Sequence, residues 1–267
     1  ENQTWEVRAS YTNPLGKNSY LELNYSFNNN NNDQKRLSYD KDGTGKYQEL
    51  VDSLSSDFKY TYNTNSGGIN YSYQGKKLNI TAGGNVSHTS VNQDDRFGNN
   101  GRSYSYTNLF PRGTLRYRFS SFSSLSLNYN GSTSQPTIDQ LQPLKNNSDP
   151  MNIVVGNPDL KQSFSNSIGL NYNSFQMMKD QYLFAGLNFN TTANQINSSY
   201  TIDEFGKQVT KYINVNGNYS LSLFSSFSRK IGKTNWRAGM SPNIMLSQNS
   251  NFINGRQNES RSLTISP

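Results

Sequence analysis

Two arginines separated by one residue are the positions in this sequence best suited to binding chemistry. Arg116 and Arg118 interleave with a leucine, a tyrosine and a phenylalanine. In an extended strand, side chains two residues apart point to the same face, so both guanidinium groups lie opposite the apolar side chains. Guanidinium groups bind carboxylates and phosphates in a fixed fork geometry. The spacing therefore makes both arginines candidates for contact with an anionic solute, and Arg237 is a weaker candidate by the same alternation.

Three aromatic residues form a second candidate site. Phe97, Tyr104 and Tyr106 fall in or at the edge of a polar stretch, 91–107, that we expect to be a long loop. Aromatic rings offer flat apolar faces with polar edges, and binding residues are often carried on loops. These three side chains are therefore candidates for stacking on a glycan or peptide solute.

The chain offers few residues for catalysis or metal binding. It has no cysteine and one histidine, His88, which excludes a thiolate site and a multi-histidine metal site. We expect His88 to be an exposed residue at a strand end. Asp94 and Asp95 supply oxygen ligands of the kind that Ca²⁺ takes, but without the spacing of an EF-hand. We expect no metal, no cofactor and no enzymatic activity.

The elements that position these residues are long alternating segments. One set of residues, 21–27, reads LELNYSF, and another, 125–129, reads LSLNY. A period of two residues is typical of β-strands with one apolar and one polar face. Long strands joined by alternately short and long connections, with tyrosine and phenylalanine on the apolar face, are typical of membrane β-barrels. We predict an all-β, antiparallel, up-and-down transmembrane β-barrel with about eleven strands in this chain.

The composition agrees with a barrel better than with a soluble core. Only 32% of the residues are hydrophobic, yet there are 18 Tyr and 14 Phe. Asn and Ser make up roughly 30% of the chain, far above globular usage. A barrel needs an apolar band on its outer face only. The net charge of +7 is scattered rather than clustered, so we expect no nucleic-acid partner.

The lengths of the connections predict an orientation. Long loops of outer-membrane barrels are extracellular and short turns are periplasmic. The expected extracellular loops are 29–62, 91–107, 132–162 and 197–208. The expected periplasmic turns are 14–17, 74–77, 120–123, 174–180 and 231–234.

Two segments carry a resemblance to a known family. Residues 134–143 (SQPTIDQLQP) precede a Gly-Asn-Pro-x-Leu motif at 156–160 and an alternating strand at 167–172. This order is similar to that of the TonB-dependent outer-membrane receptors, with SusC-like and related barrels closest in style. Residues 195–206 and 212–217 also look like a long hairpin of that family. The resemblance covers about residues 70–267.

The resemblance implies what the complete protein does. It implies an N-terminal plug domain, a barrel of about 22 strands, and energised uptake of a siderophore, glycan or peptide across the bacterial outer membrane. Residues 1–267 are then part of a single barrel domain, with the plug and the terminal strands absent from this chain. The implied partners are outer-membrane lipid, the plug, the TonB complex and a surface lipoprotein. Arg116, Arg118 and Arg237 then contact either the solute or the plug.

Two other classes remain open. A passive porin-like pore, or a cell-surface adhesin or binding protein, also suits an alternating polar β-chain. An enzyme barrel such as a protease or lipase needs clustered acid and base residues, which the sequence does not present.

Overall fold

The computed structural model describes residues 2–51, 55–96, 100–141 and 151–267. The chain divides into two compact units. Unit 1 comprises Glu1–Leu15, Tyr20–Asn70 and Gly84–Leu109, and unit 2 comprises Gly16–Ser19, Tyr71–Gly83 and Phe110–Pro267. Strands pass from one unit into the other, so each unit contains parts of the same hairpins.

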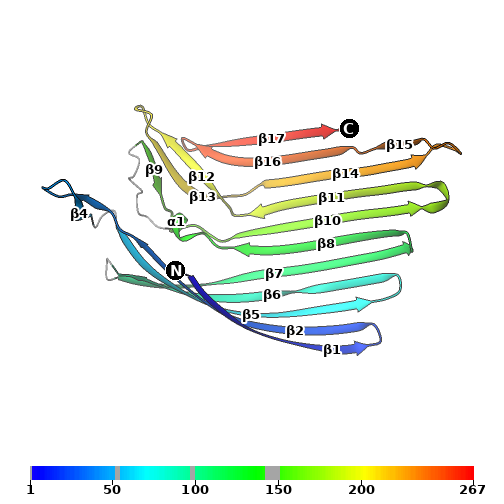
Figure 1. Cartoon of the computed structure of the whole chain (residues 1–267), viewed down its shortest axis with the longest axis horizontal. Coiled ribbons are helices and arrows are strands. Elements are labelled where there is room, and N and C mark those ends of the chain that lie inside the picture. The colour runs from blue at the N-terminus through cyan, green and yellow to red at the C-terminus, as the bar shows by residue number, and fades with distance from the viewer. Residues whose placement is uncertain (1, 52–54, 97–99, 142–150) are drawn as a thin grey trace. The chain divides into compact units, whose positions relative to one another are not determined.

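Strands dominate the described residues, as the two-residue period predicts (Figure 1). They are β1 (Asn2–Gly16), β2 (Ser19–Arg36), β3 (Tyr39–Lys41), β4 (Tyr47–Leu50), β5 (Ser56–Gln74), β6 (Leu78–Asp95), β7 (Asn100–Ser120), β8 (Ser123–Ser134), β9 (Asn152–Val155), β10 (Ser163–Gln176), β11 (Gln181–Ala193), β12 (Gln195–Ile202), β13 (Gln208–Val215), β14 (Asn218–Lys230), β15 (Arg237–Met240), β16 (Asn243–Ile253) and β17 (Arg256–Ser266). The remaining elements are a four-residue helix, α1 (Ile138–Leu141), and a 3₁₀ turn at Met177–Lys179. Neither of these is long or apolar enough to span a membrane.

The strands follow one another in a meander. Their order is β1-β2-β5-β6-β7-β8-β10-β11-β14-β16, with β17 beside β16 and β15 beside β14. The pairings from β7 to β17 along this meander are antiparallel. Two short parallel contacts depart from the expected up-and-down pattern, β12 with β16 and β13 with β9. The mainly antiparallel, all-β prediction is confirmed.

Two of the expected long loops are wrong, because strands occupy much of them. β2 continues to Arg36 and β5 begins at Ser56 within the expected loop 29–62. Similarly, β6 and β7 take up most of 91–107. Side-chain hydrogen bonds explain how the asparagine-rich end of β2 stays extended. Asn29 donates to Asn63 at 2.8 Å, and Thr61 donates to Asn31 at 2.9 Å. These cross-strand bonds offset the low strand propensity of asparagine.

The described chain has seventeen strand segments where about eleven strands were expected. β3, β4 and β9 were interpreted as loop, and β12 with β13 as a protruding hairpin outside that number. β15 and β16 both pair with β14. Pro242 lies between them and has no N–H to give to a sheet, so the ladder along β14 is interrupted there.

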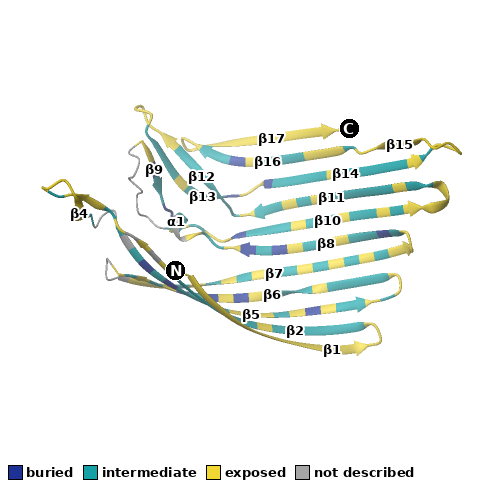
Figure 2. Cartoon of the chain, in the orientation of Figure 1, coloured by how far each residue is buried: buried dark blue, intermediate teal, exposed yellow. Residues whose placement is uncertain are grey.

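Few residues are buried in either unit (Figure 2). The buried hydrophobic residues are Phe58, Tyr60, Val91, Ile153 and Val215. β1 and β17 are exposed along their whole length. A single-layer sheet with so small a core cannot be stabilised by burial within the chain alone, since soluble folds pack at least two layers around a core.

Candidate functional site

The register of unit 2 separates an apolar face from a polar face. One row of directly paired residues crosses seven strand segments and is apolar throughout. It consists of Leu115, Leu127, Leu170, Leu187, Leu223, Ile244 and Ile265. Leu127, Leu170, Leu223, Ile244 and Ile265 are exposed. A continuous stripe of leucine and isoleucine facing outward is what a lipid-facing strand surface requires.

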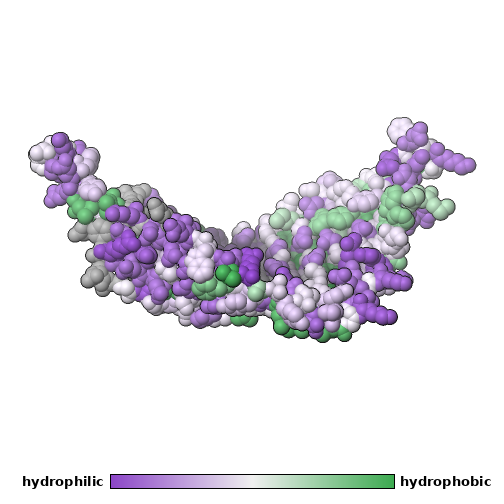
Figure 3. All heavy atoms as spheres, turned by 60° about the horizontal axis from the view of Figure 1, so that its bottom comes forward, coloured by the Kyte–Doolittle hydropathy of each residue, from purple (hydrophilic) through white to green (hydrophobic). Residues whose placement is uncertain are grey.

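The neighbouring row, one residue along each strand, is polar apart from Gly186 and Phe224. It consists of Arg116, Ser126, Asn171, Gly186, Phe224, Asn243 and Ser266. Phe224 contacts Phe184 on the same face, with ring centroids 5.5 Å apart. In the view of Figure 3, hydrophilic residues predominate and hydrophobic ones gather in patches. We call the two surfaces of unit 2 the apolar face and the polar face.

Aromatic residues accompany the short turns of unit 2. Phe119 lies edge-on to Tyr117 at 4.9 Å and to Tyr172 at 6.2 Å between centroids. Phe122 and Phe175 make a similar contact at 6.3 Å. Tyrosine and phenylalanine at the ends of apolar strands are typical of the interfacial girdle of a barrel.

The polar face carries a hollow at the turns joining β5 to β6 and β7 to β8, which we call the basic pocket. Its volume is about 620 Å³. The lining residues are Lys76, Lys77, Arg116, Arg118, Phe119, Ser120, Ser121, Ser123, Ser124 and Asn173. Both arginines predicted from the alternation thus lie in one described cavity, together with two lysines that the sequence interpretation assigned only to a turn.

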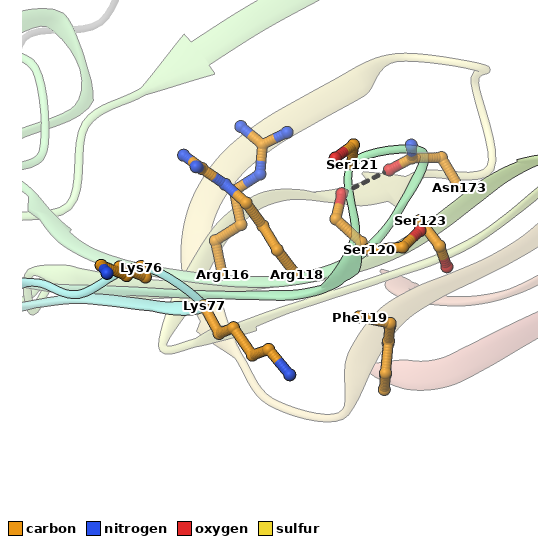
Figure 4. A pocket seen from close by; sticks show the side chains of 10 residues that line it. Lys76, Lys77, Arg116, Arg118, Phe119, Ser120, Ser121, Ser123 and Asn173 are labelled. Atoms are coloured by element: carbon orange, nitrogen blue, oxygen red, sulfur yellow. Dashed lines mark hydrogen bonds between the residues drawn. The ribbon is translucent and has the colours of Figure 1, made fainter.

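Hydrogen bonds hold the walls of the basic pocket. The Arg118 backbone N–H donates to the Lys77 carbonyl at 2.7 Å, which fixes β7 against the preceding turn. Ser124 donates to Asn173 Oδ1 at 2.7 Å. Figure 4 shows both arginine side chains rising to the same side of the sheet as Ser121 and Asn173, whereas Lys77 and Phe119 leave in the other direction.

The charge of the basic pocket is not balanced by its own walls. The lining set has four cationic side chains and, among the described residues, no Asp or Glu. The ion pairs formed by other arginines in the described ranges use Arg8, Arg96, Arg237 and Arg261. Arg116 and Arg118 make no ion pair with any described carboxylate within 4.0 Å, so their fields add on one surface.

Arg237 lies outside this pocket. It is on β15 and donates to Asp180 at 2.7 Å, across to the turn between β10 and β11. This exposed ion pair gives Arg237 a partner that the sequence did not indicate. The interaction joins two neighbouring turns.

The aromatic candidates are divided by the structure. Tyr104 and Tyr106 lie in β7 rather than in a loop, with centroids 6.4 Å apart. Tyr62 of β5 lies close to both of them, and its ring centroid is 6.3 Å from that of Tyr60. We call these four residues of unit 1 the tyrosine cluster. Phe97 lies outside the described residues.

The tyrosine cluster has a built architecture. Tyr60 and Val91 are fully buried, whereas Tyr104 and Tyr106 are half-exposed. The guanidinium of Arg102 lies 5.8 Å from the centre of the Tyr104 ring. The cluster therefore offers partly open aromatic rings on a sheet surface, which is chemically suited to stacking against a sugar ring or a peptide group.

The remaining polar candidates have local roles. His88 is exposed, as expected, but it lies within β6 and not at a strand end, 3.2 Å from the Thr107 hydroxyl. In the part of the chain that the structure describes, no three potential metal-ligating side chains of His, Cys, Asp or Glu come together. Asp94 and Asp95 belong to β6 and not to a loop.

Sequence reasoning missed the contributions of Lys76, Lys77 and Asn173. The alternation identifies which face a residue occupies but not its neighbours across strands. Pairing Arg118 with the end of the 74–77 turn would have placed Lys77 beside it, because the Arg118 backbone N–H donates to the Lys77 carbonyl. Asn173 lies at the pocket because β8 pairs with β10, which places Ser124 opposite Asn173.

The chain is similar to several solved structures. The copper transporter OprC matches with a TM-score of 0.58 and 14% identity, over 92% of this chain and 37% of OprC. The ferric enterobactin receptor PfeA of Pseudomonas aeruginosa matches with a TM-score of 0.42 and 14% identity, over 92% of this chain and 43% of the receptor. The RagAB peptide importer matches with a TM-score of 0.39 and 12% identity, over 98% of this chain and 37% of that chain.

The chain therefore spans less than half the length of each of these three proteins. No curated protein matches it. A family model for the outer membrane protein beta-barrel family matches residues 1–266. Together with the apolar and polar faces of unit 2, this match shows that the chain belongs to the outer membrane protein beta-barrel family and lies in the bacterial outer membrane.

Proposed function

We propose that this chain is part of the barrel of a TonB-dependent transporter that takes up a nutrient across the outer membrane. The observation that supports this most is the likeness in fold to the copper transporter OprC over 92% of the chain. The apolar face of unit 2 contacts lipid and the polar face lines the interior of the barrel. The solute class is a siderophore, glycan or peptide.

The complete protein then contains parts that this chain does not show. A plug domain fills a barrel of about 22 strands, and the TonB complex supplies energy from the inner membrane. A surface lipoprotein is a further partner. The short turns that carry the basic pocket face the periplasm, and the longer connections, including the turn at Asp203–Gly206, face outward.

A plugged transporter and an open pore differ in conductance. We expect the full-length protein, reconstituted in a planar lipid bilayer, to show no steady channel, because the plug blocks the lumen. We also expect it to bind the purified periplasmic domain of TonB from the same bacterium. Steady open channels without TonB binding would contradict the proposal and indicate a passive pore. Neither channels nor TonB binding would indicate an adhesin.

A further inference from the structure

We propose that the basic pocket binds the oxyanion of an organic solute, a phosphate or carboxylate carried on a larger molecule. This is a site at the short-turn end of the polar face, and its binding does not depend on energy coupling. The argument rests on the donors that the pocket presents, the charge it leaves unbalanced, and its size.

The pocket presents hydrogen-bond donors without an ionised acceptor. Its described lining consists of Lys, Arg, Ser and Asn side chains and one Phe. Lysine and arginine have donors and no acceptors. Asn173 uses its carbonyl oxygen, Oδ1, to accept the Ser124 hydroxyl at 2.7 Å. Its amide nitrogen is therefore left to donate, on the same side as Arg116 and Arg118 (Figure 4).

The two arginines are held where an anion can bridge them. They are two residues apart on one strand, so their Cα atoms are about 7 Å apart and both side chains leave the same face. Like charges on one face repel, and in the described part of the chain they have no carboxylate within 4.0 Å to relieve this. An anion accepting from both forks would remove the repulsion and form charge-assisted hydrogen bonds.

The walls of the pocket are anchored before any ligand binds. Ser124 is only 6% exposed and is paired with both Arg118 and Asn173 in the sheet register. The turn is shaped by the Phe122 backbone N–H, which donates to the Ser120 hydroxyl at 3.2 Å. Donors placed on strands and a fixed turn lose little freedom on binding, which favours affinity.

The size of the pocket indicates an organic anion rather than an inorganic one. A volume of about 620 Å³ falls within the range of roughly 300–1,000 Å³ usual for small-molecule sites. A single phosphate would leave most of it empty.

Glucose 6-phosphate and glucose provide a matched pair of probes, because they differ by the phosphate. We expect isothermal titration of the purified full-length protein in detergent to show binding of glucose 6-phosphate and not of glucose. In R116Q/R118Q the affinity for glucose 6-phosphate should fall at least about tenfold. R116K/R118K keeps the positive charges but loses the forked guanidinium groups. Its affinity for glucose 6-phosphate should therefore lie between those of the unaltered protein and R116Q/R118Q.

The control variant is R229Q. Arg229 is an exposed arginine near a short turn of unit 2, two residues beyond Phe227 on the apolar face. The R229Q variant should bind glucose 6-phosphate with the same affinity as the unaltered protein. Correct folding of each variant is checked by its heat-modifiable migration in SDS gels, and the lysine variant remains informative if the glutamine variant does not fold.

Three results would overturn the proposal. The first is equal or absent binding of glucose and glucose 6-phosphate, and the second is an equal loss in R229Q. The third is that glucose 6-phosphate does not bind to the unaltered protein and that R116Q/R118Q unfolds at a lower temperature. This result would show that an acidic segment of the protein itself occupies the pocket, because the variant would lose that stabilising contact. None of these outcomes bears on conductance or TonB binding, so failure here is distinct from failure of the proposed transport function.

Discussion

At the scale of single residues, one bulky ring on the polar face, that of Phe224, needs a small residue beside it. Phe224 lies directly opposite Gly186 in the ladder between β11 and β14. A Cβ added at Gly186 would collide with the tip of the Phe224 ring and lie 2.9 Å from Asn171 Oδ1. Packing against Phe224 therefore favours glycine here, whereas the backbone does not demand it, because the φ of Gly186 is not in the left-handed region.

We expect G186A to lower the free energy of unfolding by about 1–3 kcal/mol, because the ring of Phe224 must move. Urea unfolding of the full-length protein in lipid vesicles, followed by tryptophan fluorescence, measures this. G113A is the control, because the nearest atom to its added Cβ is 3.9 Å away. The cost of G186A should disappear in an F224A background. An equal cost in both backgrounds would show that Phe224 is not the obstacle.

Single residues were also where the sequence was most informative. The alternation alone placed Arg116 and Arg118 on the polar face, and the register confirms it. It did not reveal the Asp180 partner of Arg237, because that contact joins turns 57 residues apart in the chain. Whether Arg116 and Arg118 bind a solute remains a prediction.

At the scale of elements, two hairpins share one turn design. Asp42 accepts from the backbone N–H groups of Thr44 at 2.8 Å and Lys46 at 3.0 Å. Asp203 accepts from those of Phe205 and Lys207, both at 2.9 Å. Gly45 and Gly206 follow with φ of 81° and 78°. An aspartate that caps the turn, with a glycine in the left-handed region, is typical of hairpin loops that end in a bulge.

We expect D203A to speed hydrogen exchange of the Phe205 and Lys207 amides about fivefold, because their acceptor is lost. E204A should leave both rates unchanged. Mass spectrometry of deuterium uptake in the full-length protein measures this, and an equal increase in E204A would contradict the role of Asp203.

The corresponding turn at Asp42 should also respond to pH. The hydrogen bonds that the Asp42 carboxyl accepts lower its pKa, and the bond from the Thr44 hydroxyl has the largest effect. The carboxylate therefore contributes its full stability above the ordinary carboxyl pKa, and this contribution is lost as the pH falls through the lowered value. Protection of the Thr44 and Lys46 amides, corrected for intrinsic exchange, should follow that course.

The sequence predicted hairpins better than it predicted where strands end. The turns at 74–77 and 120–123 are where they were expected, because glycine or serine interrupts a clear alternation there. The Asn-rich end of β2 was taken for a loop, since side-chain bonds such as Asn29 to Asn63 are invisible to propensity. Hydrogen bonds to the neighbouring strand determine whether such a segment is a strand or a loop.

At the scale of the whole molecule, the central claim is that one face of the sheet meets lipid and the other lines an interior. The family match and the exposed apolar row support this. The composition and the two-residue alternation of the sequence predicted the apolar face and the polar face.

A scan along β10 tests the central claim most directly. The chain has no native cysteine, so single cysteines at 166–173 can each carry a nitroxide label in the full-length protein in lipid vesicles. Accessibility to oxygen, which concentrates in lipid, should peak at Ile168, Leu170 and Tyr172. Accessibility to a water-soluble nickel complex should instead be higher at Ser167, Gly169 and Asn171. An absence of this two-residue alternation, or the opposite phase, would contradict the account.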